Sequence, residues 1–268
     1  MILVRMMGGL GNQLFQFSFA RYLECELGKP VWLDLAYYVR HRVRSPVLGK
    51  LGIEYRKTAL AGYLWYRLNR GRFLRYEEKT FLPDVHLDGS RNDAYFWGYW
   101  QRAEYASAGR KDVLDGIRRF PKRSVVQNLA RRILETDSTS IHVRRGDYRG
   151  IPKFALLTRE YYASALDAVA ARDSESWFVF SDETRLEQGL LPAKKDIVYI
   201  SAYGLKDYEE FYLMSLCRRN ICANSTFSWW AAFLNEREGR KAAVPAKWKT
   251  REEDFRIQDY FFQDLVVL

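Results

Sequence analysis

Residues 2–35, which read ILVRMMGGLGNQLFQFSFARYLECELGKPVWLDL, decide the fold of this chain. The apolar run Ile2 to Met6 predicts a strand, and the glycine-rich stretch 8–13 predicts a tight turn. Apolar residues then recur at helical spacing until the stop signal Gly28-Lys29-Pro30. Val31 to Leu35 predicts a second strand. A strand, a helix and a strand in this order indicate a parallel sheet.

The second half of the chain shows the same alternation. Helices are predicted between apolar runs, at 159–171, 207–217 and 226–235. The runs that predict strands are 140–143, 176–180, 197–200, 220–223 and 242–244. This alternation is typical of a second doubly wound sheet, which begins near residue 137. We therefore predict an α/β protein whose 268 residues form two domains, 1–136 and 137–268.

Composition narrows the class of protein. The net charge is +10 and aromatic residues make up 16% of the chain, so an acidic partner is expected: nucleic acid, a phosphorylated substrate or an anionic membrane. Three cysteines are too few for a disulfide framework, and three histidines argue against a zinc site. We find no signal peptide and no apolar run long enough to span a membrane, which predicts a cytoplasmic protein.

Most of the excess charge lies outside the regular pattern. The segment 37–93 is rich in Arg and Tyr and gives no clear periodicity, and 112–135 is mainly helical with an interruption at Pro121. The Arg-rich stretches are 40–75 and 118–132. Because one small phosphorylated substrate cannot need all this charge, we expect a basic, aromatic-flanked face that contacts an anionic inner-membrane surface or a pyrophosphoryl lipid.

Four polar clusters follow predicted strands, at 8–13, 144–148, 181–183 and 224–228. Doubly wound sheets bind ligands at the carboxyl ends of their strands, so these clusters are the candidate site. In the first cluster Leu14 replaces the third glycine of a dinucleotide fingerprint. A glycine turn that lets a ligand or the other domain approach is the simpler interpretation, and it argues against an oxidoreductase.

The second cluster, His142-Val143-Arg144-Arg145-Gly146-Asp147-Tyr148, concentrates the most charge. A guanidinium suits a diphosphate because its planar fork makes two hydrogen bonds and keeps its charge. Strand alternation sends Arg144 and Arg145 in different directions, so one can reach a ligand while the other pairs with a carboxylate such as Asp147. A surface turn with an internal ion pair explains the same residues equally well.

The remaining clusters also have two interpretations. The segment Asn224-Ser225-Thr226-Phe227-Ser228 places hydroxyl groups at a helix start, where they bind phosphate or simply cap the helix. Asp182 and Glu183 bind ribose or base groups, or are solvated turn residues.

Taken together, these motifs resemble the α-1,2-fucosyltransferases of glycosyltransferase family 11. The resemblance covers nearly the whole chain, and its order of motifs is specific. The similar segments are Gly8 to Gln16, Phe96 to Gln101, His142 to Tyr148, Phe180 to Glu183 and Asn224 to Trp230.

The resemblance implies a GT-B fold, in which two Rossmann-like domains face each other across a cleft. It implies GDP-β-L-fucose as the donor, a galactoside acceptor, inversion at the anomeric carbon and no divalent metal or other cofactor. The final residues are expected to pack back on the N-terminal domain. A bacterial enzyme of surface polysaccharide or oligosaccharide synthesis fits the lack of an anchor.

The resemblance also assigns residues. The C-terminal half binds the donor, with Arg144 and Arg145 at the diphosphate. The other donor-site residues are Ser181, Asp182, Glu183, Asn224, Ser225, Thr226, Phe227 and Ser228. The N-terminal half shapes the acceptor side through Gly9, Gly11, Asn12, Gln13, Trp97, Tyr99 and Gln101.

Several points stay open at this stage. Asp147 and His142 are both candidates for the general base. The linkage is α-1,2 or another, such as α-1,6, and the segment 37–93, which carries no family motif, is expected to select the acceptor. The oligomeric state is not predicted. A basic nucleic-acid-binding protein is the alternative from another class, although the chain has no recognised motif for nucleic acid.

Overall fold

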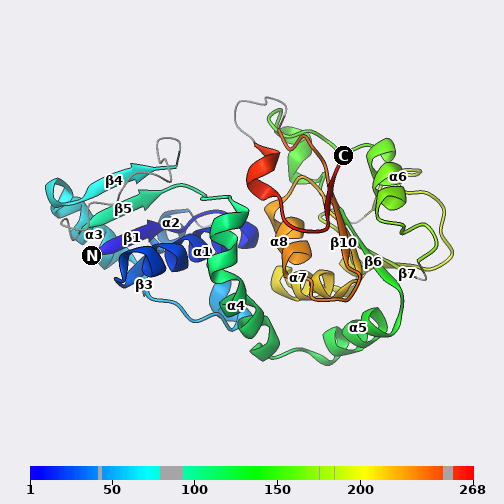
Figure 1. Ribbon diagram of the computed structural model, residues 1–268, viewed down its shortest axis with the longest axis horizontal. Helices are drawn as coiled ribbons and strands as arrows, with labels where there is room; N and C mark the ends of the chain where they lie inside the picture. The colour runs from blue at the N-terminus through cyan, green and yellow to red at the C-terminus, as the bar shows by residue number, and fades with distance from the viewer. Residues whose placement is uncertain (42–43, 79–92, 175, 184, 250–255) are drawn as a thin grey trace. The chain divides into compact units, whose positions relative to one another are not determined.

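The computed structural model describes residues 1–41, 44–78, 93–174, 176–183, 185–249 and 256–268. The chain divides into two compact units, Met1–Phe120 and Pro121–Leu268. In the described residues each unit contains one sheet, and all its strands run parallel (Figure 1). The predicted α/β class, with two parallel sheets, is therefore confirmed.

The N-terminal sheet has the strand order β3-β2-β1-β5-β4. Its strands are β1 (Ile2–Arg5), β2 (Val31–Asp34), β3 (Lys57–Thr58), β4 (Leu74–Glu77) and β5 (Ala94–Trp97). The helices are α1 (Leu10–Leu27), α2 (Ala36–Arg40), α3 (Leu60–Leu68) and α4 (Ala103–Arg119), with short 3₁₀ turns η1 (Leu48–Leu51) and η2 (Arg70–Arg72).

Helix α1 forms where the sequence predicts it. It ends at Gly28, whose left-handed φ of 59° lets its N–H donate to the Glu24 carbonyl. The apolar side of α1 covers one face of the sheet, where Phe19 packs edge-on against Phe96 and stacks on Trp100 at 4.0 Å. Helix α4 packs against α1 on this face, and α3 packs on the other face.

The C-terminal sheet has the order β11-β10-β9-β6-β7-β8. Its strands are β6 (Ser138–Val143), β7 (Ser176–Ser181), β8 (Ile197–Tyr199), β9 (Arg219–Ile221), β10 (Lys241–Val244) and β11 (Leu265–Val267). The helices are α5 (Ser124–Glu135), α6 (Arg159–Ala168), α7 (Asp207–Leu216) and α8 (Thr226–Leu234), and the 3₁₀ turns are η3 (Asp147–Gly150), η4 (Ile200–Tyr203) and η6 (Ile257–Tyr260).

In the C-terminal unit, helices cover both faces of the sheet. Tyr162 and Leu166 of α6 are fully buried against Ile141 and Val179, which point to one face of the sheet. Helices α7 and α8 cover the opposite face (Figure 1). The sheet is buried on both faces, which is why its central strands read as continuous apolar runs.

The predicted domain boundary needs correction. It falls after Phe120 and not at residue 136, because α5 packs against α7 in the C-terminal unit. A bidentate ion pair between Arg123 and Glu209 joins the two helices, with Nε–Oε1 at 2.7 Å and Nη2–Oε2 at 2.6 Å. At the end of the chain, β11 pairs with β10 in the C-terminal sheet.

Membrane-spanning helices are absent from the described ranges, because none of the helices there is both as long and as apolar as a bilayer span requires.

Candidate active site

The strand order of the C-terminal sheet reverses beside β6. From β6 the chain passes through α6 to β7 on one side, and after α7 it returns to β9 on the other side. The register pairs Ile141 of β6 with Ile221 of β9, so the loops after these strands start side by side. Ligands of doubly wound sheets bind at such a switch point. Two of the four predicted clusters, 144–148 and 224–228, follow these two strands.

Arg145 is the second residue after the end of β6 and is 9% exposed. Its Nη2 lies 2.8 Å from Oε2 of Glu187, a residue that the sequence motifs did not single out. Its Nε is buried and has no hydrogen-bond partner among the described residues. A buried guanidinium N–H without an acceptor is costly, so this atom is available to an anionic ligand.

Asp182, after the neighbouring strand β7, organises the arginine loop. Its Oδ1 accepts from the backbone N–H groups of Arg145 at 3.0 Å and Gly146 at 3.1 Å. Its Oδ2 lies 3.2 Å from Nε of Arg144, whose guanidinium also covers the Tyr148 ring. Burial acts to raise the pKa of Asp182, but the two N–H donors and Arg144 outweigh it, so the pKa is lowered.

The two adjacent arginines have different partners. Arg144 pairs with Asp182, whereas Arg145 pairs with Glu187 and keeps an unused donor. The backbone at Gly146 approaches Asp182 closely, since a Cβ there would lie 3.2 Å from the carboxylate.

His142, near the end of β6, is buried against Phe227, with 5.6 Å between the ring centroids. Burial lowers its pKa to about 3, and the charge of Arg144 adds to this effect while Asp182 opposes it. Its Nδ1 is buried without a hydrogen-bond partner in the described part of the chain. The ring is therefore neutral near pH 7 and is a weak proton acceptor.

The start of α8 forms the second side of this edge. The Ser225 hydroxyl caps the helix by accepting from the N–H of Phe227 at 3.3 Å, and Ser228 donates back to the Ser225 carbonyl. Asn224 donates through Nδ2 to the carbonyls of Ala155 and Trp248, but its buried Oδ1 has no partner within the described residues. Thr226, like Phe227, is partly exposed at the positive end of the helix dipole.

Glu183 is the remaining charged residue of the edge. Its N–H donates to the hydroxyl of Ser181, and its Oε1 accepts from Nε of Arg149 at 2.8 Å. The other carboxylate oxygen, Oε2, is buried and accepts no hydrogen bond from the described residues. It could accept from a hydroxyl or N–H group of a ligand.

Asp147 begins the turn η3, and its side chain lies outside what the structure describes. The next residue, Tyr148, stacks on Phe154 at 4.2 Å and donates to the Asn224 carbonyl at 3.2 Å. This hydrogen bond ties the loop after β6 to the loop after β9.

The acceptor-side residues predicted from the sequence gather at the carboxyl edge of the N-terminal sheet. Gly9 caps α1 and Gly11 lies buried in its first turn. Gln13 is completely buried, and its amide donates to the carbonyls of Gly8 and Ser45 and accepts from the N–H of Val47. Gln13 therefore fixes the backbone of this edge.

The aromatic motif after β5 lies beside this turn. Oδ1 of Asn12 accepts from Nε2 of Gln101 at 2.8 Å, which joins the two segments. Trp97 and Tyr99 keep about two fifths of their surfaces exposed. The guanidiniums of Arg5 and Arg75 lie 4.6 and 4.7 Å from the Trp97 ring centroid.

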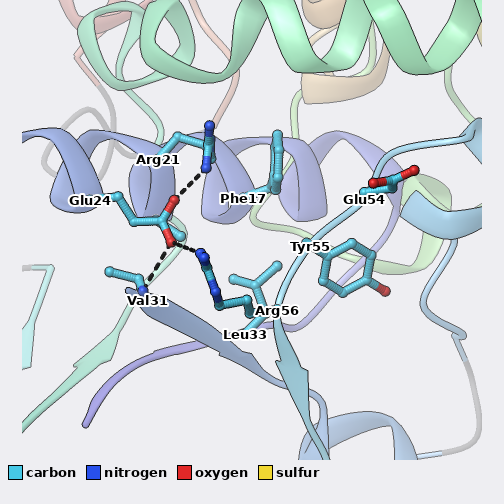
Figure 2. Close-up of a pocket in the computed structure, with 9 residues that line it drawn as sticks. Phe17, Arg21, Glu24, Val31, Leu33, Glu54, Tyr55 and Arg56 are labelled. Carbon is cyan, nitrogen blue, oxygen red and sulfur yellow. Dashed lines mark hydrogen bonds and ion pairs between the residues drawn. The ribbon is translucent and has the colours of Figure 1, made fainter. Parts of the chain in front are cut away.

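A separate pocket of about 370 Å³ lies in the N-terminal unit, between α1, β2 and the segment before β3. Figure 2 shows Glu24 at one side of this pocket, with Arg21, Arg56 and the backbone N–H of Val31 around its carboxylate. Val31 is the first residue of β2, whereas the candidate clusters follow the last residues of their strands. The Glu24 carboxylate is already paired, and we do not assign this pocket to the active site.

An arginine donor and a helix start lie together at the switch point of a doubly wound sheet, and this arrangement suits an anionic ligand. Comparison with known proteins shows which family the chain belongs to. The model of glycosyl transferase family 11 matches residues 76–264. The chain belongs to this family, and it is a glycosyltransferase.

Similar proteins of known name agree with this. An Escherichia coli alpha-1,2-colitosyltransferase is 26% identical, and the match covers 94% of this chain and 93% of that protein. The O-antigen biosynthesis glycosyltransferase WbnK of E. coli is 27% identical, with 90% and 92% covered. Galactoside alpha-(1,2)-fucosyltransferase 2 of Oryctolagus cuniculus is 24% identical, with 86% and 66% covered.

Among solved structures, POFUT1 in complex with GDP is similar with a TM-score of 0.50 at 12% identity, and the match covers 91% of this chain and 97% of that one. This likeness supports the predicted GT-B fold, which consists of two Rossmann-like units.

Proposed function

We propose that this chain is an inverting α-1,2-fucosyltransferase that moves L-fucose from GDP-β-L-fucose to a galactoside hydroxyl of a glycan, without a divalent metal. The family membership supports sugar transfer, and the names of two relatives specify an α-1,2 linkage. The WbnK relative supports a polysaccharide or oligosaccharide of the O-antigen type as the acceptor.

The buried Nε of Arg145, without a partner in the described residues, is the observation that carries this proposal. When the bond between fucose and GDP breaks, negative charge grows on the β-phosphate. A fixed guanidinium and a helix N-terminus stabilise such charge in place of a divalent cation. Arg145 supplies the first and the start of α8 supplies the second.

The proposed reaction is a single displacement. The acceptor oxygen forms a bond to C1 of fucose from the face opposite GDP, and the electron pair of the C1–O bond passes to the β-phosphate. This attack turns the β-linked donor into an α-linked product. The acceptor proton passes to a base. We favour Asp147 over His142, because the His142 ring is buried and its charged form is disfavoured by that burial and by Arg144.

The remaining residues bind the two substrates in this proposal. Glu183 accepts from a hydroxyl or N–H group of the nucleoside through its buried Oε2, and Asn224 does so through Oδ1. On the acceptor side, the partly exposed rings of Trp97 and Tyr99 offer apolar surface for a sugar.

The test is a transfer assay with purified protein, a panel of galactosides and EDTA present. The donors are GDP-fucose and GDP-colitose, whose sugar lacks the 3-hydroxyl of fucose. We expect GDP-fucose to be used faster and nuclear magnetic resonance to show fucose on O2 of galactose. An α-1,6 product, a preference for GDP-colitose or a loss of activity with EDTA would each overturn the corresponding part of the proposal.

Nucleic-acid binding is the alternative from another class, and a thermal-shift measurement separates the two. A ligand that binds only the folded protein raises its melting temperature. We expect GDP to raise it and an oligonucleotide to leave it unchanged. The reverse result would favour a nucleic-acid-binding protein.

A further inference from the structure

Helix α3 presents its apolar side to solvent. Its inner side is formed by Gly62 and Tyr66, which are buried, and Tyr66 stacks on Tyr95 of β5 at 4.1 Å. The outer side carries four exposed apolar residues that we name the α3 face: Leu60, Leu64, Trp65 and Leu68. A surface helix of a globular protein ordinarily has the opposite arrangement, with polar residues outside.

The spacing shows that this face is continuous. Leu60, Leu64 and Leu68 are each four residues apart, so they lie along one side of the helix. Leu68 is 85% exposed, and Leu60 and Leu64 are nearly half exposed. Leucine side chains exposed to water do not contribute the stabilisation that their burial would give. Such an exposed apolar patch therefore marks a surface that a partner molecule or a membrane covers.

The segment that contains α3 carries basic residues and no acidic ones. Residues 55–76 contain no Asp or Glu, and their basic residues are Arg56, Lys57, Arg67, Arg70, Arg72 and Arg75. Carboxylates elsewhere pair with three of them: Glu24 with Arg56, Asp93 with Arg72 and Glu77 with Arg75. Arg67 and Arg70 are exposed and form no ion pair with a described residue.

We propose that the α3 face docks on an anionic lipid surface. Leucines and a tryptophan beside exposed arginines are the composition of a helix that lies in a membrane interface. The leucines would enter the boundary between headgroups and acyl chains, and Arg67 and Arg70 would meet the lipid phosphates. The positive charge of these two arginines selects an anionic surface over a neutral one. This docking goes beyond the proposed transfer reaction and requires no donor.

The test is co-sedimentation of the full chain with vesicles of equal parts phosphatidylglycerol and phosphatidylethanolamine, at low salt. The double variants Leu64→Ser/Leu68→Ser and Arg67→Gln/Arg70→Gln should each lower vesicle binding by about tenfold or more. The matched control is Leu134→Ser/Arg131→Gln on α5, which carries an exposed leucine and an exposed arginine too. It should bind like the unchanged protein.

The result has clear alternatives. Equal binding to phosphatidylcholine vesicles, a loss of binding in the α5 control alone, or unchanged binding in both α3 variants would overturn the proposal. Sedimentation velocity tests whether the α3 face instead binds a second copy of this chain. If the unchanged protein is a dimer and the leucine variant is a monomer that still binds vesicles, the face is an interface between copies.

A second measurement attaches a dye to a single cysteine at an exposed position, where a substitution does not disturb the fold. Cys25 is exposed and is first changed to serine, while Cys217 and Cys222 are buried. An environment-sensitive dye on Leu68→Cys should shift to the blue when anionic vesicles are added, and the same dye on Leu134→Cys should not. Equal spectra at both positions would contradict docking through α3.

Discussion

At the carboxyl edge of the N-terminal sheet, the amides of Gln13 and Gln16 each donate and accept within the unit, to and from the backbone. At the carboxyl edge of the C-terminal sheet, Arg145, Glu183 and Asn224 each keep a buried polar atom that has no partner among the described residues. Both edges have the same place in the same type of sheet, yet their polar groups are used differently.

This difference indicates how each edge works. A buried polar group without a partner costs free energy, and a bound ligand that completes its hydrogen bonds would offset this cost. A buried group whose bonds are complete contributes to stability. We therefore expect substitutions at the C-terminal edge to reduce catalysis, and substitutions at the N-terminal edge to reduce stability.

The largest effect is expected for Arg145→Lys. Lysine keeps the charge but loses the guanidinium fork, so kcat should fall by about 10²–10³-fold, or roughly 3–4 kcal/mol. The measurement is steady-state transfer from GDP-fucose. The control Arg159→Lys makes the same change at an exposed position of α6 and should leave kcat unchanged. An unchanged rate in Arg145→Lys would remove the diphosphate role.

Next in size is Gln13→Ala at the N-terminal edge. The substitution removes a fully buried side chain and the amide that bonds the part-buried backbone of Ser45 and Val47, so the free energy of unfolding should fall by about 2–4 kcal/mol. Urea unfolding measures this. The exposed Gln127 on α5 provides a control, because Gln127→Ala should change stability by no more than about 0.5 kcal/mol. Normal stability with a raised KM for the acceptor would place Gln13 in the acceptor site instead.

His142→Leu tests the neutral buried imidazole. The folded pKa of about 3 lies below the ordinary 6.5, so the unfolded chain binds the proton first as the pH falls. Stability from this residue is complete above about pH 6.5 and falls by about 1.4 kcal/mol per pH unit from there toward pH 3. The leucine variant should lack this slope in melting temperature. A slope identical to that of the unchanged protein would mean that His142 is not buried as described.

Glu183→Gln should have the smallest effect. The change weakens the charged acceptor that Oε2 offers to the nucleoside, so the Kd for GDP should rise about fivefold, or about 1 kcal/mol. Titration calorimetry measures it, with Glu160→Gln on α6 as an exposed control. Equal affinities in the two variants would show that the partnerless oxygen does not face the donor.

Much of the fold could be predicted because its central strands are apolar and its first helix ends at a glycine. The segments that became β3 and β4 were not predicted. They are short edge strands, Lys57–Thr58 and Leu74–Glu77, whose exposed faces carry charged residues and so give no apolar run. The domain boundary was misplaced because the pairing of Arg123 with Glu209 joins residues far apart in the sequence.

For the candidate site, the sequence predicts which segments lie together but not the partners of the individual side chains. Strand ends in a parallel sheet meet at one edge, so the Arg144–Arg145 and Asn224–Ser228 segments could be expected together. Which arginine pairs and which stays available depends on Asp182, which lies on another strand. The role of Glu187 could not be predicted, since it lies in a loop beyond β7 and no motif includes it.

The central place of β1 also has a consequence for synthesis. β1 is the first strand made, and its partners are β2 and β5. Its second edge stays unpaired until Ala94–Trp97 has left the ribosome, and an open strand edge is a template for pairing with other chains. Nascent or truncated chains that end between β2 and β5 should therefore aggregate, although the finished protein covers this edge.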